Sequence, residues 1–201
     1  MIILLVEALT NMVDSFGYFG IFIATSLEYG CFPVSSEVLL PLIGYFVYRG
    51  ELSLFITILV STFGGIVGSI FCYMIGRFGK NLIEEVLVPK YKSINLGVKN
   101  AQKVFNKFGK QSVLIARVFP IARTYISFPA GLSGMNYSVF IIYTAIGSFI
   151  WNCLLISIGY ILGEHWNEAG AFLSSNRILF YVVLAILSIL FIRLGKRKNN
   201  S

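Results

Sequence analysis

Two segments of this chain carry charged residues inside otherwise apolar sequence. Glu28 and Glu37 lie on the first segment, and Arg117 and Arg123 lie on the second. The two guanidinium groups offer forked donors that match the oxygens of a phosphate group, and Pro120 between them breaks the helix, so helical phase does not keep them apart. Acids inside a membrane commonly serve as proton relays. We therefore expect Arg117 and Arg123 to bind a charged headgroup, and Glu28 and Glu37 to act in proton coupling or ion pairing.

The composition indicates that these segments lie in a membrane. Of the 201 residues, 57% are hydrophobic and 12% are charged, whereas soluble domains carry about a quarter charged residues. We interpret residues 1–201 as a single membrane domain. The formal net charge of +7 could suggest nucleic-acid binding, but the basic residues gather where membrane topology would place them, so no nucleic-acid partner is expected.

Charges inside a bilayer need partners. Each charge costs about 3 kcal/mol at the centre of a membrane helix, so four that faced lipid would cost roughly 10 kcal/mol. Such side chains must face one another or a water-filled cavity. Two interpretations stay open: the four residues form ion pairs that only fasten their segments together, or they line a polar cavity that admits a charged headgroup.

Uncharged runs of about 20 residues, long enough to cross a bilayer, predict the transmembrane helices. Residues 52–76 form one such run, and residues 137–163 form another after an interruption at Pro129. A shorter run, 178–192, lies between Arg177 and Arg193, whose long side chains can reach the headgroups. We predict residues 177–195 as a C-terminal transmembrane helix.

Two regions, one before each of the first two spans, are predicted as re-entrant helical hairpins, over residues 15–48 and 111–134. In the first region the uncharged runs are too short to cross the bilayer, and in both regions prolines that remove a backbone donor interrupt the helix signal. The predicted hairpin breakers are Pro33, Pro41, Pro120 and Pro129. The alternative for the first region is one ordinary tilted span over residues 15–36 with Glu28 in its middle.

The two halves of the chain, 15–76 and 111–163, resemble each other. Phe32-Pro33 and Phe119-Pro120 are each followed by a second proline eight or nine residues later. Glycines twelve residues apart recur in the two spans: Gly64 and Gly76, then Gly147 and Gly159. Because the spans run in opposite directions, the halves would be inverted copies, with a transport site near the bilayer midplane. We predict an all-α integral membrane fold, an inverted repeat of a re-entrant hairpin plus a transmembrane helix.

Basic residues set the expected orientation. The segment 77–110 is rich in lysine, and from Ile94 onward its apolar residues fall on one side and its lysines on the other. This pattern predicts an amphipathic helix on the inner leaflet. The tail after Arg193 is also basic. By the positive-inside rule both regions are cytoplasmic, and the N-terminus and the 164–176 loop face outward.

The sequence gives no indication of an enzyme or a cofactor. Cys31, Cys72 and Cys153 are isolated in apolar stretches, and His165 is the single histidine, so we expect no metal site. No nucleophile is paired with a base, as hydrolysis would require, so we expect no catalytic residue and prefer a transporter to a membrane phosphatase. The polar residues near the arginines are expected to line or cap: Tyr125, Ser127 and Asn136.

Over roughly residues 15 to 165 the chain resembles the DedA family of membrane proteins, the VTT-domain or SNARE-associated superfamily. The most specific match is Arg117-x-x-Pro120-x-x-Arg123 followed by Ala130-Gly131 and Met135. The remaining matching residues are Glu28, Phe32-Pro33, Ser36-Glu37, Tyr73, Gly76-Arg77, Gly79, Phe140, Gly147 and Trp151. At two positions the chain departs from the family pattern: Ser35 stands where a proline is often found, and Ser69 where many members have an acid.

The resemblance implies lipid transport. Bacterial members are similar to flippases that return undecaprenyl phosphate to the cytoplasmic leaflet, others are linked to phosphatidylethanolamine, and dependence on the proton-motive force has been proposed. For this chain it implies a bacterial cytoplasmic membrane protein that moves a lipid phosphate between leaflets, with undecaprenyl phosphate favoured. A phospholipid flippase or scramblase and a small-ion or drug/proton exchanger stay as alternatives, and a homo-oligomeric assembly stays open.

Overall fold

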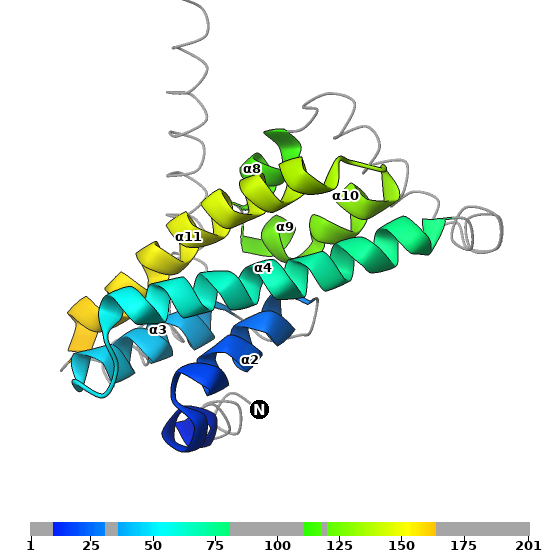
Figure 1. Ribbon diagram of the computed structural model, residues 1–201. Helices are drawn as coiled ribbons and strands as arrows, with labels where there is room; N and C mark the ends of the chain where they lie inside the picture. The colour runs from blue at the N-terminus through cyan, green and yellow to red at the C-terminus, as the bar shows by residue number, and fades with distance from the viewer. Residues whose placement is uncertain (1–9, 31–35, 81–110, 118–119, 164–201) are drawn as a thin grey trace, which may run out of the picture.

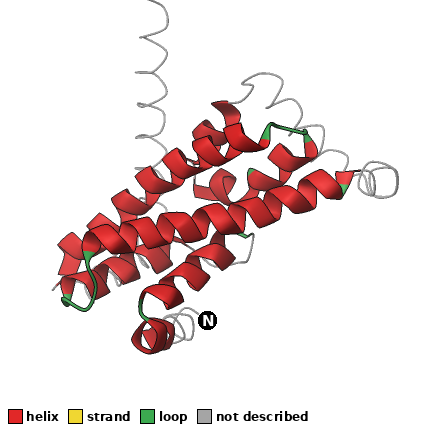
Figure 2. Cartoon of the chain, in the orientation of Figure 1, coloured by secondary structure: helices red, strands yellow, loops and turns green. Residues whose placement is uncertain are grey.

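The computed structural model describes residues 10–30, 36–80, 111–117 and 120–163. Within these ranges the chain is helical and contains no strand (Figure 2), which confirms the all-α class for the described part of the chain. The helices are α2 (Tyr18–Tyr29), α3 (Ser36–Tyr48), α4 (Leu54–Phe78), α8 (Gln111–Arg117), α9 (Pro120–Tyr125), α10 (Ser127–Leu132) and α11 (Tyr137–Leu162).

Two long apolar helices, α4 and α11, form the centre of the molecule. They contain 25 and 26 residues and are long and apolar enough to cross a membrane, since about 20 helical residues span the hydrocarbon. They pack against each other and run in opposite directions (Figure 1). The Asn136 side chain caps α11 by accepting a hydrogen bond of 3.3 Å from the Val139 amide, which fixes where this helix begins.

The shorter helices pack on the long ones in an exchanged pattern. We call α2 and α8 the first arms of the two halves, and α3 and α10 the second arms. Helix α2 lies along α4 and α8 lies along α11, so the first arm of each half contacts the long helix of its own half. Helix α3 lies along α11 and α10 lies along α4, so the second arm contacts the long helix of the other half. The two halves are therefore interlocked, and neither long helix is covered by its own half alone.

Glycines let the helix backbones approach closely where α3 packs on α11 and where α10 packs on α4. A Cβ atom added at Gly159 of α11 would collide with the backbone carbonyl of Pro41 in α3, and one added at Gly76 of α4 would collide with the carbonyl of Phe128 in α10. Gly131 faces α4 in the same way, against the Tyr73 carbonyl. Small residues at such crossings let helix backbones approach in a membrane, where close packing drives association.

The prolines have different structural roles. Pro41 lies inside α3, which continues to Tyr48, so its prediction as a hairpin breaker was wrong. The close packing of α3 on α11 supports the backbone there, and membrane helices tolerate proline under such support. Pro120 is the first residue of α9 and Pro129 lies in the first turn of α10, where a missing amide donor leaves no helical bond unmade. Pro33 lies outside the described residues.

Helix α2 ends at Tyr29, where Gly30 caps it. Its 12 residues correspond to about 18 Å at 1.5 Å per residue, which is shorter than the hydrocarbon thickness of about 30 Å. The predicted amphipathic segment beyond Lys80 and the predicted C-terminal span 177–195 lie outside the described residues.

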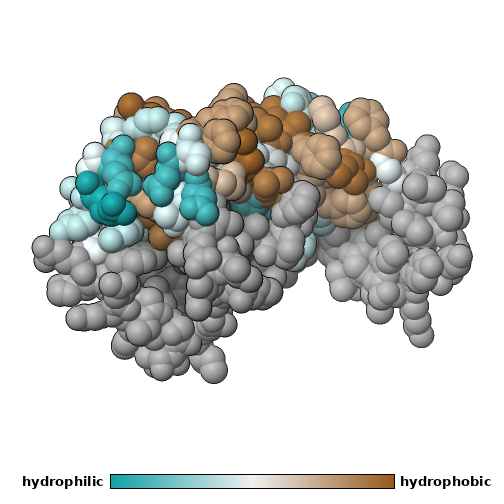
Figure 3. Space-filling model, turned by 90° about the horizontal axis from the view of Figure 1, so that it is seen from below, coloured by the Kyte–Doolittle hydropathy of each residue, from teal (hydrophilic) through white to brown (hydrophobic). Residues whose placement is uncertain are grey.

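The outer surface of the helices is apolar. Large hydrophobic side chains are exposed along both long helices, for example Phe55 at 68%, Phe78 at 79% and Ile161 at 78%. On the face drawn in Figure 3, hydrophobic residues cover much of the described surface and hydrophilic residues gather toward one end. An apolar surface of this extent is the kind that faces lipid or another apolar partner.

Candidate functional site

An ion pair lies in the interior of the helix bundle. The Arg123 guanidinium in α9 donates through Nη2 to the Glu28 carboxylate of α2, and both side chains are 1% exposed. The same Nη2 atom contacts the Ser36 hydroxyl at the start of α3. Two helices of the first half thus hold an arginine of the second half, across 95 residues of sequence.

The second buried arginine has a different environment. Arg117, the last residue of α8, is 1% exposed. Its Nη2 atom lies 2.8 Å from the Ser69 hydroxyl of α4, 3.0 Å from the Ser127 hydroxyl of α10 and 3.3 Å from the Thr144 hydroxyl of α11. All of its hydrogen bonds to described residues therefore go to neutral hydroxyl groups.

Aromatic rings bring the two guanidinium groups together. The ring of Tyr29 lies 5.3 Å from Cζ of Arg117 and 4.9 Å from Cζ of Arg123, and Trp151 lies 5.0 Å from Cζ of Arg123. These distances allow cation–π attraction. The Tyr29 hydroxyl donates to Asn152 Oδ1 at 2.9 Å, and Gly65 leaves room for the ring, since a Cβ atom there would lie 3.2 Å from its carbons.

Several polar atoms of this cluster are buried without a hydrogen-bond partner among the described residues. They are Nε and Nη1 of Arg117, Nε and Nη1 of Arg123, and Oε2 of Glu28. Leaving a buried polar group unsatisfied costs about 1–3 kcal/mol, and more for a charged group. Such groups are rare in native proteins, and a functional role or a bound ion is among their explanations; unpaired guanidinium N–H groups are suited to binding an anion.

The predicted site residues occupy one region. Arg117, Arg123 and Glu28 meet around Tyr29. Glu37 is half-buried in the first turn of α3 and lies within electrostatic reach of Glu28 and Arg123. Of the predicted lining and capping residues, Ser127 contacts Arg117, Asn136 caps α11 and Tyr125 is 60% exposed.

The sequence pattern does not assign the other residues of the cluster. It does not single out Tyr29 or Thr144, and it marks Ser69 only as a departure from the family pattern. Ser36 and Trp151 match that pattern without an assigned role. The signal that could have found Thr144 and Ser69 is the register of the two spans, because both lie on the same helix faces as the repeated glycines.

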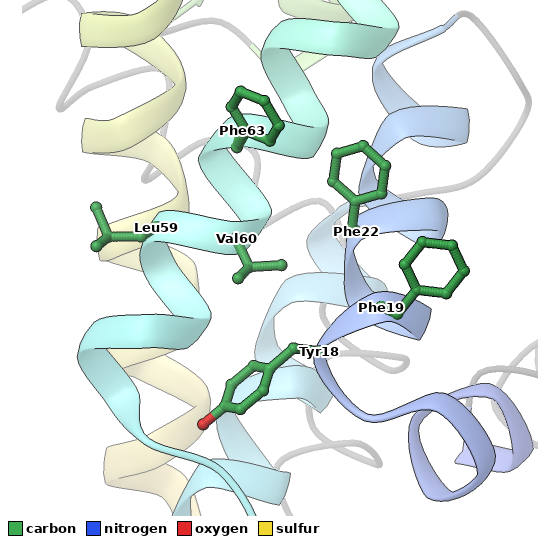
Figure 4. Close-up of a pocket in the computed structure, with 6 residues that line it drawn as sticks. All are labelled: Tyr18, Phe19, Phe22, Leu59, Val60 and Phe63. Carbon is green, nitrogen blue, oxygen red and sulfur yellow. The ribbon is translucent and has the colours of Figure 1, made fainter.

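The apolar groove drawn in Figure 4 lies away from these charges. It has a volume of about 430 Å³ between α2 and α4 and is lined by Tyr18, Phe19, Phe22, Leu59, Val60 and Phe63. The ring centroids of Phe22 and Phe63 are 5.8 Å apart. None of the cluster residues Arg117, Arg123 and Glu28 lines it, so the groove is a feature of the apolar surface.

Among the described residues, no three His, Cys, Asp or Glu side chains are grouped to hold a metal ion. Two cysteines fall within these ranges, Cys72 and Cys153, and both are free thiols. The chemistry available in the cluster is therefore that of two guanidinium groups, a carboxylate, hydroxyls and aromatic faces.

Apolar helices of membrane-spanning length around a buried charged cluster define an integral membrane protein with an internal polar site. The chain belongs to the VTT-domain (DedA) family, since the family model of the VTT domain matches residues 32–161.

Among its relatives is undecaprenyl phosphate transporter A of Staphylococcus aureus, 33% identical over 96% of this chain and 98% of the relative. The transporter of the same name from Bacillus subtilis is 30% identical over 90% and 92% of the two chains. A Lactococcus lactis protein named alkaline phosphatase-like protein is 31% identical over 96% and 92%. No solved structure matches the chain.

Proposed function

We propose that this protein transports a lipid phosphate, with undecaprenyl phosphate as the favoured substrate, between the leaflets of the bacterial cytoplasmic membrane. Two relatives that the chain covers almost completely are named undecaprenyl phosphate transporter A, and the buried cluster has the chemistry to bind a phosphate group. The lipid tail would stay in the bilayer while the headgroup enters the site.

The observation that carries the proposal is the excess of buried guanidinium groups. Arg117 and Arg123 are each 1% exposed, and on each one Nε and Nη1 lack a partner within the described ranges. Glu28 pairs with Arg123, whereas Arg117 bonds to hydroxyls. A buried cation without a carboxylate is costly, and an entering phosphate would satisfy both its charge and its donors.

The interlocked halves support an alternating-access mechanism. In our proposal, α2–α3 and α8–α10 are re-entrant hairpins of two inverted repeats, and the arginine site lies between them near the midplane. The exchanged packing of α3 on α11 and of α10 on α4 ties the two repeats together at both crossings. Rocking of one repeat against the other would expose the site to each leaflet in turn, with the N-terminus outside and the C-terminus cytoplasmic.

The acids would reset the site. Glu28 and phosphate compete for Arg123 in this scheme, so release of Arg123 from Glu28 frees donors for the substrate. Glu28 and Glu37 would exchange protons during the cycle, as intramembrane acids do in other transporters. Dissipating the proton gradient should then slow uptake of lipid phosphate into proteoliposomes, and an unchanged rate would remove proton coupling from the proposal.

The decisive experiment is transport by reconstituted arginine variants. Arg117→Ala and Arg123→Ala should each abolish movement of undecaprenyl phosphate across proteoliposome membranes, because each removes donors from the site. Arg49→Ala is the matched control: Arg49 forms an ion pair of 2.9 Å with Glu51 and its side chain is 51% exposed, and its loss should leave transport unchanged. Normal transport by both buried-site variants would reject the mechanism.

A membrane phosphatase is the second candidate, because one relative is named alkaline phosphatase-like protein. The same proteoliposomes separate the two functions. A transporter moves the intact lipid phosphate, whereas a phosphatase releases inorganic phosphate from it. Phosphate release by the purified protein that disappears in Arg117→Ala would favour the enzyme.

A further inference from the structure

The hydrogen bonds of the Arg117 guanidinium group to described residues all involve one of its nitrogen atoms, Nη2. An Nη2 amino group has two hydrogens, yet three hydroxyl oxygens lie within 3.3 Å of it, those of Ser69, Ser127 and Thr144. The Nε and Nη1 atoms of the same side chain have no hydrogen-bond partner in the part of the chain that the structure describes. The hydroxyls thus outnumber the hydrogens at one end of the guanidinium group, while the donors at its other end bond to none of the described residues.

Each of these hydroxyls has donor capacity left. A Ser or Thr hydroxyl carries one O–H hydrogen and can accept at its oxygen. Here the three oxygens face the Arg117 Nη2 as acceptors, so their hydrogens remain for a group that accepts. The surroundings of Arg117 are therefore rich in donors: the O–H groups of three side chains and the N–H groups at Nε and Nη1.

We infer that Arg117, Ser69, Ser127 and Thr144 form the seat of a terminal phosphate group, a phosphate monoester. This inference rests on the proposed function and assigns the first contact to Arg117 rather than to both arginines equally. Arg123 is held by Glu28 and Ser36 and lies beside Trp151. Arg117 is the arginine whose hydrogen bonds go to neutral groups, so it can receive the anion without first losing a carboxylate.

The donor-rich seat selects between headgroups. A phosphate monoester presents three terminal oxygens and no ammonium group, which suits a ring of O–H and N–H donors. A zwitterionic phosphoethanolamine headgroup carries an ammonium that needs acceptors, and the Ser69, Ser127 and Thr144 oxygens already face Arg117. The seat thus favours lipids ending in a monoester over phosphatidylethanolamine.

The seat also joins helices from both halves of the molecule. Ser69 lies on α4, Ser127 on α10, Thr144 on α11 and Arg117 on α8. A phosphate bound there would contact both long helices and both arms of the second hairpin. Binding is then sensitive to how the two halves are placed, as alternating access requires.

The test is lipid binding by native mass spectrometry of the full-length protein in detergent, with dioleoyl phosphatidic acid as the monoester probe and dioleoyl phosphatidylethanolamine as the comparison. The parent protein should retain phosphatidic acid in preference. Ser69→Ala, Ser127→Ala and Thr144→Val should each weaken phosphatidic acid binding about tenfold, because each removes one hydrogen bond to a charged group. Thr144→Ser keeps the hydroxyl and should restore binding.

Ser61→Ala is the matched control. Ser61 is also buried on α4, and its hydroxyl makes no hydrogen bond to a described residue, so its loss should leave phosphatidic acid binding unchanged. Inorganic phosphate added at millimolar concentration identifies the source of the ligand. Displacement of the lipid from the parent protein, weakened in Thr144→Val, supports the seat and shows that free phosphate also enters it.

Two results would overturn the inference. One is unchanged phosphatidic acid binding in all three hydroxyl variants while Arg117→Ala still abolishes transport, which leaves the proposed function intact and removes the seat. The other is preferential retention of phosphatidylethanolamine by the parent protein. Failure of the proposed function looks different, because Arg117→Ala and Arg123→Ala would then transport normally whatever the lipid binding.

Discussion

The two halves of the molecule share one architecture but carry opposite chemistry. In each, two short arms accompany one long helix, and the second arm crosses to the long helix of the other half. The first half supplies the Glu28 carboxylate to the interior and the second supplies the guanidinium groups of Arg117 and Arg123. The shared architecture is therefore the scaffold, and the site arises where the halves differ.

Equivalent positions of the long helices show this difference directly. Residues 83 apart in sequence correspond: Ser61 and Thr144, Gly64 and Gly147, Ser69 and Asn152, Gly76 and Gly159. Thr144 contacts Arg117, whereas the Ser61 hydroxyl bonds to no residue that the structure describes. Ser69 contacts Arg117, whereas Asn152 accepts from Tyr29. The glycines keep the same packing role in both halves, and the polar residues do not.

The largest expected effect comes from breaking the charge pair between the halves. Arg123→Ala leaves the Glu28 carboxylate buried without its cation, which should cost about 3–5 kcal/mol of stability. The double variant Glu28→Gln/Arg123→Gln removes both charges and should recover most of the unfolding free energy but no transport. Chemical unfolding in micelles and proteoliposome transport measure the two quantities.

Normal transport by that double variant would show that the pair only fastens the halves together. Breaking the exposed pair Arg49–Glu51 with Arg49→Ala is the reference for stability. It should lower the unfolding free energy little, since surface ion pairs contribute about 0–1 kcal/mol.

The next effect tests whether the two crossings are equivalent. Gly159→Ala and Gly76→Ala each place a Cβ against a backbone carbonyl, of Pro41 and Phe128 respectively. Both should destabilise the protein by about 2–3 kcal/mol, in the range of overpacking. Leu154→Ala, at a position that is 45% exposed on α11, is the control and should change stability little. A large effect at one crossing alone would contradict the equivalence.

A smaller effect separates packing from ligand binding at a repeated glycine. A Cβ at Gly147 would lie 2.7 Å from Cβ of Arg117, and one at Gly64 would lie 2.7 Å from the Phe22 carbonyl. Both Ala variants should lose about 1–2 kcal/mol of stability. Gly147→Ala alone should also weaken phosphatidic acid binding, measured by native mass spectrometry, because it displaces the Arg117 side chain. Equal binding by both variants would count against a special role of Arg117.

The smallest effect concerns a polar contact present at one crossing. The Tyr73 hydroxyl donates to the Met135 carbonyl and accepts from Arg77 Nη1 at 2.7 Å. The equivalent position in the second half is Ile156, which is buried in the apolar core. Tyr73→Phe should cost about 1 kcal/mol in thermal unfolding, and Tyr125→Phe, at a 60% exposed side chain, should cost nothing measurable.

Local sequence was enough to predict the two long helices closely. The spans expected at 52–76 and 137–163 correspond to α4 at Leu54–Phe78 and α11 at Tyr137–Leu162, because an uncharged run of this length has few alternatives in a membrane. Pro41 shows the limit of local rules. A proline weakens a helix by removing one donor, but packing of α3 on α11 keeps α3 continuous.

The placement of Glu28, Glu37, Arg117 and Arg123 within apolar segments can be read from the sequence. Their partners follow from tertiary packing: Arg123 pairs with Glu28, while Arg117 meets Ser69, Ser127 and Thr144. The two kinds of information differ in their range along the chain. Helix formation and burial depend on neighbouring residues, whereas the partner of a buried charge depends on which arm packs on which long helix, and here that contact joins residues 95 apart.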